Sequence, residues 1–143
     1  MMTEKDLYRY KHAVLEERRR RLLLLEHEER LNALKSPSAP SIPSGSDGSS
    51  KIAADLDRLE RCRAKLTEAI SEVSLAEMLL DTARKCLDDR ECRVFDVLYY
   101  GYTEKGVRVF PIIRVAAKKL NYSPSAIYSI RQRILEKIAP LPA

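Results

Sequence analysis

Fifteen residues rich in serine, proline and glycine, Ser36–Ser50, separate two stretches that have helical periodicity. They hold seven Ser, three Pro and two Gly. This composition sustains neither a helix nor a hydrophobic core, and it is typical of a loop or flexible connector. The chain must therefore fold as helical segments on either side of the break. Its 143 residues suffice for one domain, or for a small domain with an arm.

Both stretches beside the break have the apolar spacing of long helices. We predict one helix over residues 4–34, begun by Thr3 with Asp6 near its positive end, and a second over residues 51–80. The second helix has a coiled-coil-like seam with alternating steps of four and three, formed by Ile52, Leu56, Leu59, Leu66, Ile70 and Val73. The two helices are expected to form an antiparallel hairpin.

The first helix carries two neighbouring apolar stripes. One stripe comprises Leu7, Tyr10, Val14, Leu24 and Leu31, and the other comprises Leu15, Leu22 and Leu25. A face this wide can pack against one or two other helices. A helical arm of this kind is marginally stable alone and its seam is a natural surface for self-association, so we expect a homodimer formed through the N-terminal helices. Four consecutive arginines, Arg18–Arg21, can bind phosphate or RNA. The surrounding acids instead favour a solvated helix face with i,i+4 ion pairs.

Composition favours helices and excludes a membrane span. Charged residues make up 33% of the chain, above the usual quarter, and there are four Gly and no Trp. The longest aliphatic run, Leu22–Leu25, is far shorter than the roughly 20 residues that cross a bilayer. No apolar secretory segment follows the N-terminus, so we expect a cytoplasmic protein with no membrane partner. Cys62, Cys86 and Cys92 are expected on helices as reduced, small core residues.

The positive charge of the chain is concentrated at its C-terminal end. Residues 1–35 carry +2, residues 36–50 carry −1 and residues 51–106 carry −2. Residues 107–143 hold seven bases and one acid and carry +6, which accounts for the net charge of +5. This distribution favours a polyanionic partner for the C-terminal end.

The C-terminal third divides into short helices. Asp88 or Asp89 can cap a helix over residues 90–100, which Gly101 ends, and residues 102–110 form a turn that contains a second glycine.

A helix-turn-helix follows that turn. Pro111 fits the first turn of a helix that continues to Leu120, and Ser123 followed by Pro124 starts a final helix that ends near Ile138. Ala116 and Ala117 permit close helix crossing, and Ile127, Ile130, Ile134 and Ile138 lie within about 80° on one face of the final helix. Two short helices joined by a tight turn are the outline of this DNA-binding motif.

The other face of the final helix carries groups that suit base edges and phosphates. We assign base reading to Ser125, Tyr128, Ser129, Gln132 and Arg133, and phosphate binding to Arg114, Lys118, Lys119 and Arg131. No acid precedes Glu136 on this face, and a carboxylate held against phosphate would be repelled. Sparse aromatics favour double-stranded DNA over RNA as the partner.

These residues also carry a resemblance to a known family. The segment from Leu87 through Tyr102, followed by Val115–Ser123, resembles region 4 of sigma-70-type factors. The whole layout resembles phage and prophage transcriptional regulators of the ArpU or RinA kind, although the spacer over Tyr102–Phe110 is longer than usual there. The resemblance implies DNA binding at phage late-gene promoters and activation through host RNA polymerase.

The sequence offers few candidate catalytic or metal-binding residues. His12 and His27 are the only histidines, and no Gly-rich phosphate loop exists, so we expect no enzymatic activity, metal or cofactor. Two other functions stay open beside a transcriptional regulator. One is a DNA-binding assembly subunit like the phage small terminase, and the other is a coiled-coil adaptor that binds no DNA.

The predicted fold is therefore all-α, with an N-terminal long helical hairpin and a C-terminal helix-turn-helix bundle. Residues 1–35 form the first helix of the arm, 36–50 the linker, 51–86 the second long helix and 87–143 the DNA-binding domain.

Overall fold

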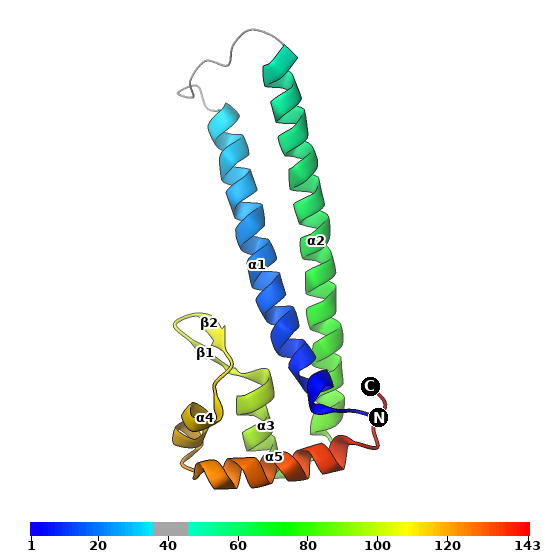
Figure 1. Ribbon diagram of the computed structural model, residues 1–143, viewed down its shortest axis with the longest axis vertical. Coiled ribbons are helices and arrows are strands. Elements are labelled where there is room, and N and C mark those ends of the chain that lie inside the picture. Colours follow the sequence, from blue (N-terminus) through cyan, green and yellow to red (C-terminus); the bar gives the residue numbers. More distant parts are fainter. Residues whose placement is uncertain (36–45) are drawn as a thin grey trace. The chain divides into compact units, whose positions relative to one another are not determined.

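The computed structural model describes residues 1–35 and 46–143, most of which are helical. In chain order the elements are α1 (Glu4–Lys35), α2 (Ser46–Arg84), α3 (Asp89–Phe95), the π-helical turn η1 (Asp96–Tyr100), β1 (Tyr102–Glu104), β2 (Val107–Val109), α4 (Ile113–Leu120) and α5 (Pro124–Ile138) (Figure 1). The described residues form two compact units, residues 14–72 and residues 1–13 with 73–143. The predicted all-α class, with a long helical hairpin and a helix-turn-helix, is confirmed. One small sheet is added to it.

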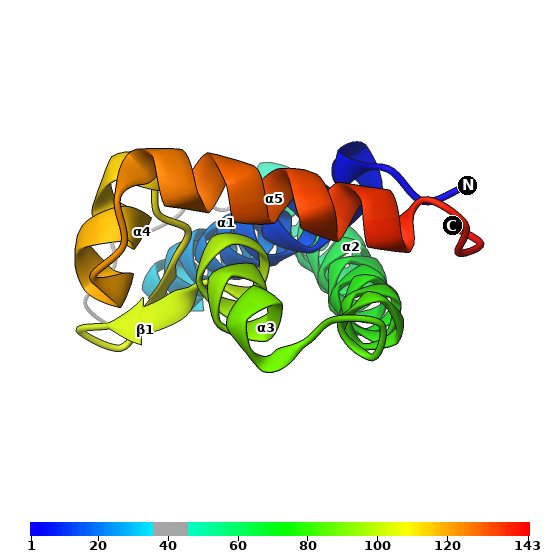
Figure 2. The same cartoon turned by 90° about the horizontal axis from the view of Figure 1, so that it is seen from below.

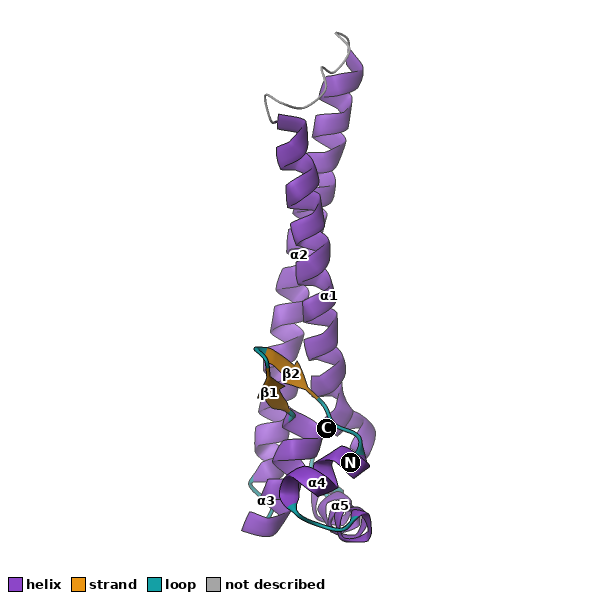
Figure 3. Cartoon of the chain, turned by 90° about the vertical axis from the view of Figure 1, so that its left-hand side faces the viewer, coloured by secondary structure: helices purple, strands orange, loops and turns teal. Residues whose placement is uncertain are grey.

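The unit of residues 14–72 is a helical hairpin in which α1 and α2 run side by side (Figures 1 and 3). Leu31 of α1 and Leu59 and Leu66 of α2 are buried in it. Arg63 and Glu28 join the helices through an ion pair of 3.9 Å between Nη2 and Oε1. The second helix begins at Ser46, five residues before the predicted start. Extending a formed helix costs less than nucleating one, so poor helix formers can occupy its first turn. Residues 36–45 of the predicted linker lie outside the described residues.

The predicted apolar seam of α2 is only partly buried. Leu59 and Leu66 are buried as predicted, but Leu56 and Ile70 are exposed. Over residues 51–84 of α2, the buried residues are Leu59, Leu66, Ala69, Ala76, Leu80 and Ala83. Three of these six residues are alanines, whose small side chains give a weak signal in a search for large apolar residues.

The arginine run on α1 forms ion pairs along its own helix, as predicted, and Arg19 and Arg21 are exposed. Arg19 and Arg20 both contact Glu16, at 2.9 and 2.8 Å, and Arg21 contacts Glu17 at 2.8 Å. These are ion pairs between residues three or four positions apart on one helix. The interpretation as a helix face with local ion pairs is therefore confirmed.

The second unit is a helical bundle around the isoleucine stripe of α5. Ile127, Ile130, Ile134 and Ile138 are buried, as are Val94 and Phe95 of α3 and Tyr99 of η1. Seen from below, α5 lies across α3 (Figure 2), and the two helices are in contact. Leu7 at the start of α1 and Leu80 near the end of α2 are also buried in this unit. The short C-terminal helices therefore share a core with the ends of the two long ones.

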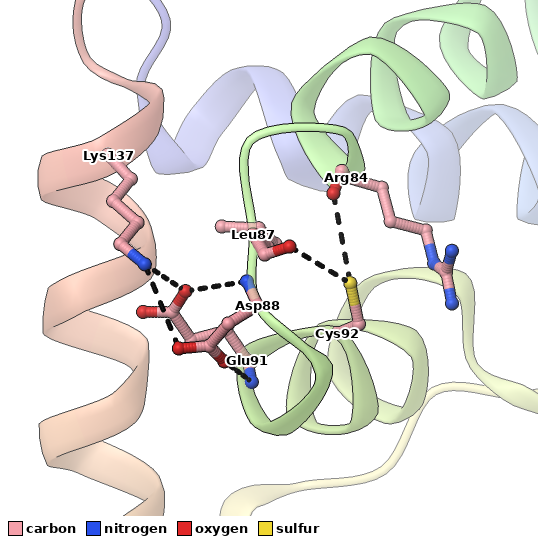
Figure 4. Close-up of polar contacts among 6 residues, drawn as sticks. All are labelled: Arg84, Leu87, Asp88, Glu91, Cys92 and Lys137. Carbon is pink, nitrogen blue, oxygen red and sulfur yellow. Dashed lines mark hydrogen bonds and ion pairs between the residues drawn. The ribbon is translucent and has the colours of Figure 1, made fainter.

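A capping box begins α3 and ties it to α5 (Figure 4). Asp88 Oδ1 accepts from the backbone N–H of Glu91 at 2.8 Å, and Glu91 Oε1 accepts from the N–H of Asp88 at 3.0 Å. Lys137 Nζ donates to the same glutamate oxygen at 2.5 Å. The predicted cap is thus confirmed at Asp88, and a contact between α3 and α5 is added to it.

The predicted turn over residues 102–110 contains an antiparallel β-hairpin. Tyr102 pairs with Val109, and Glu104 pairs with Val107. Lys105 and Gly106 at the tip have φ of 52° and 77°, as a two-residue hairpin turn of the primed type requires. Strands of three residues are too short to show alternation in the sequence, so their pairing was not predicted.

The cysteines do not occupy the core, so that interpretation was wrong. Cys86 is exposed in the turn after α2, and Cys62 and Cys92 are partly exposed. Cys92 Sγ lies 3.7 Å from the carbonyl oxygen of Arg84 and 3.8 Å from that of Leu87. All three are free thiols.

Candidate nucleic-acid interface

The turn between α4 and α5 is fixed at both helix ends. Asn121 adopts the left-handed conformation, with φ of 58°, and its N–H bonds back to the last turn of α4. Ser123 Oγ then accepts from the N–H of Ala126 at 3.2 Å, and Pro124 takes the first helical position of α5. Buried Ala116 and Ala117 face the bundle. The local chemistry of the sequence thus positions α5 as the second helix of the motif.

All five residues assigned to base reading are exposed, but they do not share one direction. Ser125, Ser129 and Gln132 lie along the centre of the exposed face, opposite the buried isoleucines. Tyr128 and Arg133 lie on opposite flanks, about 140° apart around the helix axis. The centre of the exposed face is therefore polar and uncharged, with an aromatic ring on one side and a guanidinium on the other.

Three of the four residues assigned to phosphate binding are exposed cations of α4: Arg114, Lys118 and Lys119. Lys119 Nζ lies 3.9 Å from the centre of the Tyr102 ring, so the hairpin holds this ammonium group beside α4. Within residues 1–35 and 46–143, none of the three forms an ion pair with a carboxylate. Their charge is available to an external anion.

Arg131, the fourth, is partly buried and already paired. Its Nη1 lies 3.5 Å from Glu4 Oε1, and its guanidinium lies 5.2 Å from the ring of Tyr128. Glu4 also accepts a hydrogen bond from the hydroxyl of Tyr99 at 3.3 Å. Burial is the main cause, and the negative charge of Glu4 the second, that raises the pKa values of Tyr8 and Tyr99 above the ordinary value of tyrosine. Arg131 is therefore placed to orient Tyr128 and to hold the start of α1.

A second basic cluster was missed by the sequence reasoning. The guanidinium groups of Arg90 and Arg93 on α3 lie 5.4 and 5.8 Å from the ring of Tyr122, in the turn before α5. Both arginines are exposed. Both belong to residues 51–106, whose net charge is −2, so a charge count by segment did not single them out. Tyr122, an aromatic residue in the turn before α5, was the sequence feature that could have indicated this cluster.

Acidic residues border this surface on several sides. Glu104 of β1 lines a shallow pocket together with Lys118 and Lys119, and Glu4 pairs with Arg131. Glu136 is exposed in the last turns of α5, as its position in the sequence implies. On the flank that carries Arg133, Asp88 Oδ2 lies 3.8 Å from Lys137 Nζ (Figure 4). Among the described residues, the exposed face without carboxylates is therefore that of α5 before Glu136.

The described chain shows neither a metal cluster nor a membrane helix. Among residues 1–35 and 46–143, no three His, Cys, Asp or Glu side chains gather where they can hold a metal ion. No helix of this part is both long enough and apolar enough to cross a bilayer. The chain matches no protein-family model, no curated protein sequence and no solved structure.

Proposed function

We propose that this protein is a sequence-specific DNA-binding transcriptional regulator of phage or prophage type. The observation that carries the proposal is the exposed face of α5, which has no acid before Glu136, next to the cations of α4. There the centre of α5 offers Ser125, Ser129 and Gln132, and α4 offers three cations that form no ion pair with a carboxylate of residues 1–35 and 46–143. Hydroxyl and amide groups can hydrogen-bond to base edges, and lysine and arginine neutralise phosphates. In the bound state α5 lies in the major groove and α4 contacts the backbone beside it.

The residues of this surface divide into two functional sets. Ser125, Ser129 and Gln132 read bases from the centre of α5, with Tyr128 and Arg133 at the two edges of the groove. Arg114, Lys118 and Lys119 bind phosphates. Arg131 acts on phosphate less than these three, because Glu4 already neutralises it. Activation through RNA polymerase, which the family resemblance implies, is part of the same proposal.

A stripe of exposed leucines on α1 supports a dimer as the active form. Leu22 and Leu25 of α1 are 58% and 50% exposed, and Leu15 precedes them on the same stripe at a spacing of seven residues. The stripe that contains Leu31 is the one that α1 turns inward. A second copy can cover the outward leucines and place two helix-turn-helix motifs on one duplex.

Selection of bound duplexes from a random pool tests the function directly. The parent protein should enrich a sequence motif. Arg133→Ala should then weaken binding to the enriched duplex by about 1–3 kcal/mol if the guanidinium contacts a base. Arg61→Ala is the matched control, because Arg61 pairs with Asp57 at 2.7 Å on the arm. Failure to enrich any motif, or equal binding by the parent and Arg133→Ala, argues against the assignment.

A further inference from the structure

A groove of about 630 Å³ lies in the C-terminal unit, beside the helix-turn-helix. Its walls come from the first turns of α1, from the segment between β2 and α4, and from one flank of α5. This volume falls within the range of about 300–1,000 Å³ that small-molecule sites occupy in proteins. The groove is therefore large enough to enclose a small organic molecule.

One part of the groove is apolar. Phe110, Ile112 and Ile113 line it, and the Ile112 side chain is 66% exposed. A large aliphatic side chain beside a concave surface gains free energy when a ligand covers it, because apolar area leaves water. This wall suits an aromatic ring or a short acyl chain.

The polar part of the groove is basic. Lys11 of α1, Arg114 of α4 and Arg131 of α5 line it, and no Asp or Glu is among the described residues of its lining. Glu4 lies next to the groove and is engaged by Arg131 at 3.5 Å. Lys11 and Arg114 form no ion pair within the described parts of the chain. An anion that enters therefore meets two cations without competing carboxylates.

The start of α4 adds backbone donors to these cations. Ile112 is the N-cap residue of α4, and no side chain caps the helix there. The first N–H groups of an α-helix have no acceptor within the helix, and together they carry a partial positive charge. Because Ile112, Ile113 and Arg114 line the groove, this uncapped end borders it. Helix ends of this kind bind carboxylate, sulfate and phosphate groups.

We propose that this groove binds a small amphipathic anion. Its acidic group lies between Lys11, Arg114 and the start of α4, and its ring or acyl chain lies against Phe110, Ile112 and Ile113. The groove shares Arg114 with the surface assigned to DNA. Lys11 and Ile112 lie outside that surface, so their variants test the groove while the residues assigned to DNA stay unchanged.

Two fluorescent probes of the same shape test the site in the full-length chain without DNA. Anilinonaphthalene sulfonate carries the anionic group, and phenylnaphthylamine is its uncharged counterpart. We expect the sulfonate to saturate one site per chain and to bind about tenfold or more tightly than the neutral probe, since only the anion forms charge-assisted hydrogen bonds. Spectra of isoleucine methyl groups should shift at Ile112 and Ile113 and stay unchanged at buried Ile134.

Two variants and one control locate the binding. Lys11→Glu and Ile112→Asp should each weaken sulfonate binding by about tenfold or more, since each places a carboxylate in the groove. Lys85→Glu, an equal charge change at an exposed residue outside the groove, should leave it within about twofold. Thermal unfolding followed by circular dichroism establishes that all variants are folded. Equal binding of the two probes, or unchanged binding in folded Lys11→Glu and Ile112→Asp, would overturn the proposal.

Discussion

The carboxylate of Glu91 connects three segments of the C-terminal unit. The residue is 1% exposed, and its carboxylate accepts hydrogen bonds from the N–H of Asp88 and from Lys137 of α5 (Figure 4). Burial of a carboxylate is costly unless it is paired and hydrogen-bonded. Here both conditions are met, so this residue fixes the start of α3 against the last turns of α5.

Replacement of Glu91 should therefore lower stability through two lost contacts. We expect Glu91→Ala to reduce the free energy of unfolding by about 1–3 kcal/mol, because it removes one half of the capping box and leaves a backbone N–H unpaired. Glu91→Gln should cost less, since its amide oxygen still accepts. Urea unfolding measures both, with Glu68→Ala at an exposed position of α2 as the control. A loss in Glu91→Ala no greater than in that control would contradict this role.

The charge of Asp88 should make stability fall in acid. The backbone hydrogen bond from Glu91, and then nearby Lys137, lower the pKa of Asp88 below its ordinary value. Because the folded-state pKa is the lower one, its contribution is complete above the unfolded value of about 4 and is lost as the pH falls through the folded value.

Asp88→Asn isolates this effect, since asparagine still caps a helix. Between about pH 6 and about pH 3, a range that spans the unfolded-state pKa of about 4, the parent should lose more thermal stability than this variant. Calorimetry at several pH values measures the difference. Parallel curves for the two proteins would show that the charge of Asp88 is not involved.

At the scale of elements, the start and end of α5 were predictable because local chemistry marks both. Ser123 and Pro124 begin the helix where expected, and the buried isoleucines lie on the predicted face. The seam of α2 was predicted only in part, because buried Ala69 and Ala76 are too small and too weakly hydrophobic to mark a seam in the sequence. The pairing of Glu4 with Arg131 joins residues 127 positions apart, and no local pattern reports such a contact. This ion pair changed the expected role of Arg131, which was assigned to phosphate binding.

The β-hairpin depends on a glycine at its base. Gly101 has φ of 73°, and a methyl group there would lie 2.3 Å from the carbonyl oxygen of Val109. We expect Gly101→Ala to lower the free energy of unfolding by at least about 2 kcal/mol, from the backbone conformation and the clash together. Gly106→Ala shares the positive φ but meets nothing within 4 Å, so its cost should be about 1 kcal/mol. Equal losses in urea unfolding would contradict the steric argument.

At the scale of the whole molecule, the outward leucines of the arm predict self-association. The parent should have twice the 16.4 kDa mass of one chain in light scattering after gel filtration. Leu22→Glu combined with Leu25→Glu should be a monomer, because four carboxylates would be brought together in the dimer.

Leu75→Glu combined with Met78→Glu is the matched control, since these α2 residues are also exposed and lie outside the stripe. That variant should stay a dimer. A monomeric parent would exclude this use of the stripe, and a ring of many subunits would favour an assembly subunit like the small terminase.

The central claim is that the helix-turn-helix recognises a DNA sequence. The most direct measurement is the affinity for an enriched duplex and for a scrambled duplex of equal length, each at several salt concentrations. We predict about a thousandfold or greater preference for the enriched duplex. We also predict a log–log salt slope of about −2.7 for each bound chain, since Arg114, Lys118 and Lys119 each release counterions. Equal affinity for both duplexes, or binding that does not respond to salt, would contradict the claim.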